Sequence, residues 1–105
     1  MKTQHGASRK SEVVRIRVEL FGMARLACGA RDVEIEVPLV AGVGDIVTAL
    51  SEACPELVGE VILQDRSRLR ESYTFNLNGT RFLSNEPLHL RTSDKLLLFS
   101  SQAGG

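Results

Sequence analysis

Hydrophobic and charged side chains alternate over residues 13–20, and this period of two predicts a strand with one buried face. The same alternation over residues 32–37 predicts a second strand. The apolar members of the two segments are Val14, Ile16, Val18, Leu20, Val33, Ile35 and Val37. Residues 22–31 join the strands, and we expect a short helical turn there before Gly29. The pair therefore forms an antiparallel hairpin, which Pro38 ends because proline lacks the N–H that a ladder hydrogen bond needs.

A helical period follows the hairpin. Apolar residues recur at the spacing of an amphipathic helix, namely Val43, Ile46, Val47, Leu50 and Cys54. Gly42 is an acceptable N-cap, and Asp45 in the first turn suits the positive end of the helix dipole. Pro55 ends the helix, because the residue before a proline avoids helical angles. We expect a short second helix over residues 57–62 and a charged surface loop over residues 64–71.

The C-terminal part returns to the strand period. Residues 73–77 alternate, and Asn78-Gly79 is a strong hairpin signal because both turn positions need a positive φ. Residues 80–83 form the return strand. The last strand, residues 95–100, contains four consecutive apolar residues and is expected to be central and buried on both faces. The order of elements predicts an α+β fold, a mixed sheet with one main helix on one face, in which the third long strand or the last strand lies parallel to the first.

Composition narrows the class of protein. The 105 residues fit one domain, which we divide into a disordered N-terminal arm (1–12), a folded domain (13–100) and a flexible tail (101–105). Thirteen basic and thirteen acidic residues give no overall positive field for nucleic acid or an anionic membrane. No apolar run approaches the roughly 20 residues of a membrane span, and residues 1–12 lack the apolar stretch of a signal peptide. We therefore expect a soluble, cytoplasmic protein.

Cysteine and arginine residues offer weaker candidates for chemistry. Cys28 and Cys54 form no Cys-x-x-Cys motif, so we expect no metal site built by this chain, and both thiols are expected to pack in the core. Arg66, Arg68 and Arg70 are expected to lie in a solvated loop, with docking of an acidic partner as the alternative.

The tail Ser101-Gln102-Ala103-Gly104-Gly105 is the most informative feature. Five extended residues reach roughly 16 Å, and glycines without a Cβ can thread a narrow channel. The carboxyl of Gly105 is the candidate reacting group: activated as an acyl-adenylate and attacked by sulfur, it becomes a thiocarboxylate. The other four tail residues are expected to enter a partner's active site.

Two segments carry a family resemblance. The ending from Asp94 to Gly105 and the spacing Phe21-x3-Arg25-x3-Gly29 resemble the MoaD/ThiS sulfur-carrier superfamily, and most of all its molybdopterin synthase small-subunit (MoaD) branch. The resemblance implies a ubiquitin-like β-grasp fold and a non-catalytic carrier subunit without a bound cofactor. It implies ATP-dependent activation by an E1-like adenylyltransferase, sulfur from a sulfurtransferase or cysteine desulfurase, and a MoaE-like large subunit as partner in molybdenum cofactor synthesis.

The resemblance also assigns a partner surface. Phe99 falls where the MoaD branch has an aromatic that packs on the large subunit. Leu97 shares its parity in the last strand, so we assign both to the partner interface. Ser100-Ser101 stands where many MoaD tails have two prolines. Three alternatives stay open: a ubiquitin-like protein modifier, a sulfur carrier for thiamine, tRNA thiolation or cysteine, and a β-grasp binding module without carboxylate chemistry.

Overall fold

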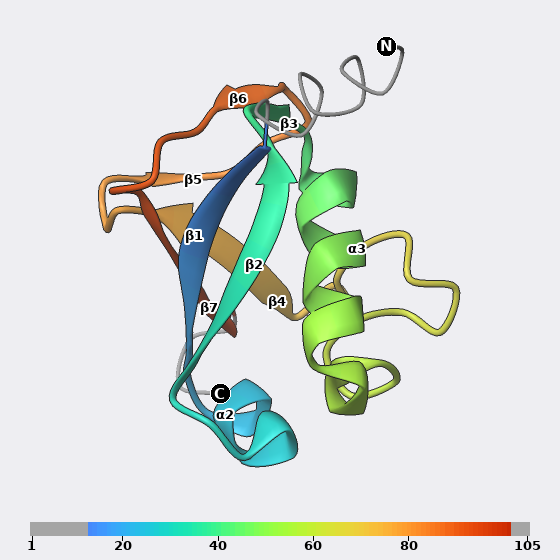
Figure 1. The fold of residues 1–105 in the computed structure, drawn as a ribbon. Helices are drawn as coiled ribbons and strands as arrows, with labels where there is room; N and C mark the ends of the chain where they lie inside the picture. The colour runs from blue at the N-terminus through green and yellow to red at the C-terminus, as the bar shows by residue number, and fades with distance from the viewer. Residues whose placement is uncertain (1–12, 102–105) are drawn as a thin grey trace, which may run out of the picture.

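The computed structural model describes residues 13–101, which form a five-stranded mixed sheet in the order β2-β1-β7-β4-β5. The helix α3 covers one face of this sheet (Figure 1). In chain order the elements are β1 (Val13–Leu20), α2 (Met23–Cys28), β2 (Asp32–Pro38), β3 (Val40–Ala41), α3 (Val43–Ala53), the 3₁₀ helix η1 (Pro55–Leu57), β4 (Tyr73–Leu77), β5 (Arg81–Phe82), β6 (Leu88–His89) and β7 (Lys95–Ser100). This architecture confirms the predicted α+β, ubiquitin-like β-grasp fold.

The last strand occupies the centre of the sheet. β7 runs parallel to β1, with Val18 opposite Leu96, and antiparallel to β4, with Phe75 opposite Leu98. β1 also pairs with β2 in an antiparallel hairpin. Of the two predicted parallel neighbours of the first strand, the structure therefore selects the last strand. Its end, where the tail begins, lies at the same end of the sheet as α2 (Figure 1).

A single core lies between the sheet and α3. Alternate residues of the four long strands point into this core, and the apolar face of α3 packs against them from the other side. Its fully buried members include Ile16, Val18, Leu20, Ile46, Val47, Leu50, Leu96 and Leu98. Leu97 and Phe99 point to the opposite side of β7, which we call the outer face, and are half-buried. The two faces of β7 are therefore divided as predicted, whereas the expected burial of this strand on both faces is wrong, because its outer face is only half-buried.

Substitution of Leu98 by alanine should destabilise the domain by about 2–5 kcal/mol, because it opens a cavity at a fully buried site. Urea unfolding followed by circular dichroism measures this loss. Leu97→Ala, one residue away on the same strand, is the matched control and should cost less than half as much because its side chain is only half-buried. Equal losses in the two variants would contradict the assigned faces.

The predicted turns are present. Gly29 ends α2 in the left-handed conformation, with φ of 75°, and its N–H donates to the carbonyl of Arg25 at 2.8 Å. Asn78 and Gly79 both have positive φ, 57° and 75°, as the hairpin signal requires. At the start of α3, the Asp45 carboxylate accepts a hydrogen bond from the Gly42 N–H at 2.9 Å.

The predicted second helix over residues 57–62 is wrong. Only the 3₁₀ turn Pro55–Leu57 forms, because Gly59 adopts a φ of 95° that no right-handed helix tolerates. The chain then folds back so that Val61 and Ile62 are fully buried, and Ile62 bridges to Leu69. These apolar residues pack into the core as a compact loop and not as a helix face.

Three further details differ from the sequence prediction. The return strand is shorter than residues 80–83 and spans only Arg81–Phe82. Leu69 is buried, although its segment was expected to be a surface loop. Asn76, a polar position in the alternation of β4, is 8% exposed because it lies on the outer face between Leu97 and Phe82. Its Oδ1 has no hydrogen-bond partner among the described residues.

Candidate functional site: the base of the tail

The tail leaves the domain at the end of the central strand, beside the start of β4. The Ser101 N–H donates to the carbonyl of Ser72 at 2.7 Å, one step beyond the pairing of Ser100 with Tyr73. The predicted tail residues Gln102, Ala103, Gly104 and Gly105 lie outside the described residues, as does the predicted arm 1–12. The domain therefore fixes the point of exit at Ser101, and we call this point the tail base.

Aromatic side chains gather on the outer face next to the tail base. The Phe99 ring packs edge-on against Phe21, with centroids 6.4 Å apart and planes at 87°. It also contacts Phe82 with centroids 6.1 Å apart, and Phe82 is 63% exposed. We call Phe21, Phe82 and Phe99 the aromatic cluster. The structure thus places the predicted interface residues Phe99 and Leu97 on an accessible face, and their role in binding stays a prediction.

The short helix α2 adds apolar surface that the sequence analysis missed. Met23 is 50% exposed and Leu26 is 74% exposed, although both are large and apolar. With Phe21, Tyr73 and Phe99 they line an open hollow of about 480 Å³ that also reaches Ser100. We call it the apolar hollow. The signal in the sequence was the short helical turn itself. This turn, α2, buries Ala24 and turns its larger apolar residues to solvent. Exposed apolar groups around a hollow are typical of a binding surface.

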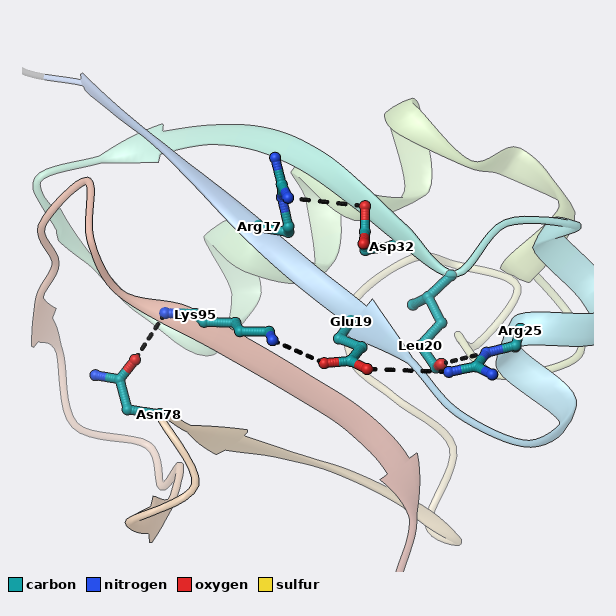
Figure 2. A network of polar contacts seen from close by, with 7 residues as sticks. All are labelled: Arg17, Glu19, Leu20, Arg25, Asp32, Asn78 and Lys95. Atoms are coloured by element: carbon teal, nitrogen blue, oxygen red, sulfur yellow. Dashed lines mark hydrogen bonds and ion pairs between the residues drawn. The ribbon is translucent and has the colours of Figure 1, made fainter.

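A polar network holds the corner between β1 and α2 (Figure 2). The Glu19 carboxylate pairs with Lys95 Nζ at 2.9 Å and lies 4.0 Å from Arg25 Nη2. Arg25 Nε donates to the carbonyl of Leu20 at 3.0 Å, and its guanidinium lies 5.6 Å from the centre of the Phe21 ring. Arg25 therefore joins the strand end to the aromatic cluster. This gives the Phe21-x3-Arg25-x3-Gly29 spacing a structural reason, since Gly29 ends the helix that carries the arginine.

The Glu19–Lys95 contact predicts a pH-dependent stability. The hydrogen bond from Lys95 lowers the pKa of Glu19 below its ordinary value. A lowered folded-state pKa stabilises the protein above the unfolded value of about 4.3, and this contribution disappears as the pH falls through the folded value. The difference in unfolding free energy between the wild type and Glu19→Gln should therefore be larger at pH 7 than at pH 3.

Chemical denaturation of both proteins across this range measures the difference. Lys95→Gln removes the partner of Glu19 and leaves the carboxylate in place. Its loss of unfolding free energy relative to the wild type should likewise be larger at pH 7 than at pH 3. A wild-type advantage over Glu19→Gln that stays constant from pH 3 to pH 7 would show that this ion pair does not contribute as described.

The two cysteines are reduced and of unequal exposure. Cys54 is buried and Cys28 is partly exposed. Burial, together with the neighbouring Cys28 thiol and the Glu56 carboxylate, raises the pKa of Cys54 to about 12. Its thiol therefore stays protonated near neutral pH, which suits a core residue and not a nucleophile. Within residues 13–101, no group of three or more His, Cys, Asp or Glu side chains is arranged to hold a metal ion.

Solved structures with the same fold are known, whereas no family model and no curated protein matches the sequence. SAMP1 from Haloferax volcanii is 28% identical, with a TM-score of 0.71 over 87% of this chain and 99% of that one. A second structure, of H. volcanii small archaeal modifier protein 1, is also 28% identical, with a TM-score of 0.69 over 85% and 99% of the two chains. A Pyrococcus furiosus protein provisionally named molybdopterin converting factor subunit 1 is 24% identical, with a TM-score of 0.61 over 85% and 99%.

These neighbours are consistent with the MoaD/ThiS-like ubiquitin-fold superfamily, in agreement with the resemblance seen in the sequence. The Haloferax volcanii small archaeal modifier protein, 28% identical in both of its structures, supports the class of ubiquitin-like modifiers. The P. furiosus likeness, at 24% identity, shows the fold alone. No helix in the described part of the chain is long and apolar enough to cross a membrane.

Proposed function

We propose that this chain is a sulfur carrier whose Gly105 carboxyl is the working group. The observation that carries the proposal is the exit of the Gly-Gly tail from the central strand of a β-grasp domain, beside an accessible aromatic cluster. A central strand is a rigid support for a reacting group that must reach into another protein. The carrier supplies no acid, base or bound cofactor, and ATP is used by the partner enzyme.

The reaction begins with activation of the carboxylate. One oxygen of Gly105 attacks the α-phosphorus of ATP on an E1-like adenylyltransferase, which releases pyrophosphate and leaves an acyl-adenylate. A persulfide on a sulfurtransferase or cysteine desulfurase then displaces AMP to form an acyl-persulfide. A second thiol reduces the S–S bond, forms a disulfide with the sulfur donor and leaves a thiocarboxylate on Gly105. Gly104, Ala103, Gln102 and Ser101 serve as the stalk that enters each active site.

The most favoured acceptor is the molybdopterin precursor, with this chain as the small subunit of molybdopterin synthase. The Phe21-x3-Arg25-x3-Gly29 spacing and the position of Phe99 support this acceptor, and the name of the P. furiosus neighbour is in line with it. In this arrangement a MoaE-like large subunit packs on Phe99 and Leu97 and performs the catalysis. The use of ATP and persulfides suits the cytoplasm.

Adenylation can be tested directly. The purified chain is mixed with the E1-like enzyme of the source organism, and ATP–pyrophosphate exchange is followed with labelled pyrophosphate. We expect exchange that depends on the chain and saturates with its concentration. Absence of exchange, with the same enzyme active on another carrier, would overturn the proposed function.

A second candidate function is protein modification, because the small archaeal modifier protein of H. volcanii is 28% identical to this chain in both of its structures. In this case the activated Gly105 carboxyl forms an isopeptide bond with a lysine. Covalent adducts that disappear when Gly104 and Gly105 are removed would favour this function. Both functions share the adenylation step, so the exchange assay does not separate them, whereas the search for adducts does.

A further inference from the structure

A second hollow, of opposite character to the apolar hollow, adjoins the tail base. It measures about 450 Å³ and is lined by Leu63, Arg68, Arg70, Glu71 and Ser72. We call it the basic hollow. Ser72 lines it and also accepts the hydrogen bond from Ser101, while the next residue, Tyr73, lines the apolar hollow. The tail therefore leaves the domain on the border between the two hollows.

This position has a consequence for any enzyme that acts on the tail. Four residues follow Ser101, and a fully extended chain of that length spans about 13 Å at about 3.3 Å per residue. An active site that receives the Gly105 carboxyl must lie within that distance of Ser101. The surface around such an active site then comes close to both hollows, whichever partner is bound.

The basic hollow is held in place by its loop. Leu69 is buried between its two arginines, and the Arg70 N–H donates to the carbonyl of Val61 at 2.8 Å. The Leu63 N–H likewise donates to the carbonyl of Arg68 at 3.0 Å. These three points fix the backbone of the loop, while Arg66, Arg68 and Arg70 themselves are exposed, as expected of a solvated loop.

The positive charges of this loop lack the close ion pairs that several other arginines form. Arg15, Arg17 and Arg25 each have a carboxylate within 4.0 Å. Among residues 13–101, neither Arg68 nor Arg70 has such a partner, and Arg70 instead donates to the carbonyl of Gly59 at 3.3 Å.

Two carboxylates lie near these arginines. Asp65 is occupied by the N–H and hydroxyl of Ser67, at 3.0 and 2.7 Å, and these bonds, followed by the charge of Arg68, lower its pKa. Glu71 is exposed on the rim of the basic hollow. Neither forms a close ion pair with Arg68 or Arg70, so both guanidinium groups stay available to an acidic partner.

We propose that the basic hollow is a docking site for acidic side chains of the activating enzyme. Arg68 and Arg70 bind carboxylates on the enzyme surface on one side of the tail, while the apolar hollow receives an apolar side chain on the other side. Two unlike contacts on opposite sides of a stalk fix the rotation of the carrier about its tail, so the carboxyl approaches ATP in one orientation. This inference rests on the proposed function and adds the partner's chemistry to it.

The test is the charge reversal Arg68→Glu/Arg70→Glu in the full chain, assayed by ATP–pyrophosphate exchange with the E1-like enzyme. We expect the KM for the carrier to rise about tenfold or more with kcat changed less than about twofold, since the contact positions the carrier without touching the reacting atoms. The wild-type KM should rise with salt, and this dependence should be weaker in the variant. Arg68→Lys/Arg70→Lys keeps the charge and should recover most of the affinity.

Arg91→Glu is the matched control. Arg91 is exposed and precedes β7, so the six residues of that strand, roughly 20 Å, separate it from the tail base. Circular dichroism and thermal unfolding establish that each variant is folded before kinetics are compared. A KM for the double reversal equal to that of Arg91→Glu overturns the docking site and leaves the proposed function intact. Failure of the wild type itself to support exchange overturns the proposed function, and the docking site with it.

Discussion

Deletion of Gly105 should abolish thiocarboxylate formation and sulfur transfer while leaving the domain fully folded. The deletion removes the proposed reacting carboxyl and offers a new one a residue closer to the domain, about 3.3 Å short of its target. A displacement of this size defeats the alignment that nucleophilic attack on ATP requires. The core residues in the described part of the chain all precede Ser101. Product formation with the activating enzyme and ATP, measured by mass spectrometry of the intact protein, gives the result.

Extension is the matched control for this deletion. Two alanines added after Gly105 keep every native residue but move the terminal carboxyl, so the extended protein should be equally inactive. Both variants should unfold at the same temperature as the wild type. Activity retained by either variant would mean that the carboxyl of Gly105 is not the reacting group, and a binding module without carboxylate chemistry would then be favoured.

Substitution of Phe99 by alanine should weaken binding to the large subunit by about 2 kcal/mol, or roughly 30-fold. Phe99 contacts both other rings of the aromatic cluster, so its loss removes a contact surface and also frees Phe21 and Phe82. Aromatic side chains near the centre of an interface commonly dominate its affinity. Isothermal titration with a MoaE-like large subunit measures the change, and the wild type should bind it tightly enough to be titrated.

Phe82→Ala separates binding from folding in this experiment. Phe82 is 63% exposed and lies at the edge strand β5, farther along the outer face. It should reduce affinity less than Phe99→Ala does and should leave stability nearly unchanged. If Phe99→Ala binds the large subunit as well as the wild type does, the assignment of Phe99 to the partner interface is wrong.

The sequence predicted most of the fold, because the decisive signals are local. The alternation of Val14 to Leu20, the stripe of α3 and the Asn78-Gly79 turn each depend on residues close in the chain. The parity of β7 was also readable, since Leu96 and Leu98 share one face and Leu97 and Phe99 the other. Once these elements are placed, few arrangements of a mixed sheet and one helix remain.

What the sequence did not show depends on contacts between distant segments. Gly59 stops the expected second helix, and its φ of 95° is set by the way the following loop folds back on the core. Leu69 is buried because Ile62 lies opposite it, although its immediate neighbours are charged. Met23 and Leu26 are exposed because α2 is too short to bury more than one side.

The candidate site divides along the same line between local and long-range features. The tail residues were identified from the sequence because their chemistry lies in the backbone carboxyl and in glycine itself. The apolar and basic hollows were not, because the first combines α2 with the end of β7 and the second depends on a loop whose conformation is tertiary. The hydrogen bond between Ser101 and Ser72, which joins segments 29 residues apart, brings both hollows to the tail base.

The most direct test is the mass of the C-terminal peptide after the chain has been isolated together with its activating enzyme, ATP and a sulfur donor. We predict that one oxygen of the Gly105 carboxyl is replaced by one sulfur, and that fragmentation places the change on Gly105 alone. An unmodified Gly105 under conditions in which the same enzymes thiocarboxylate another carrier would contradict the central claim.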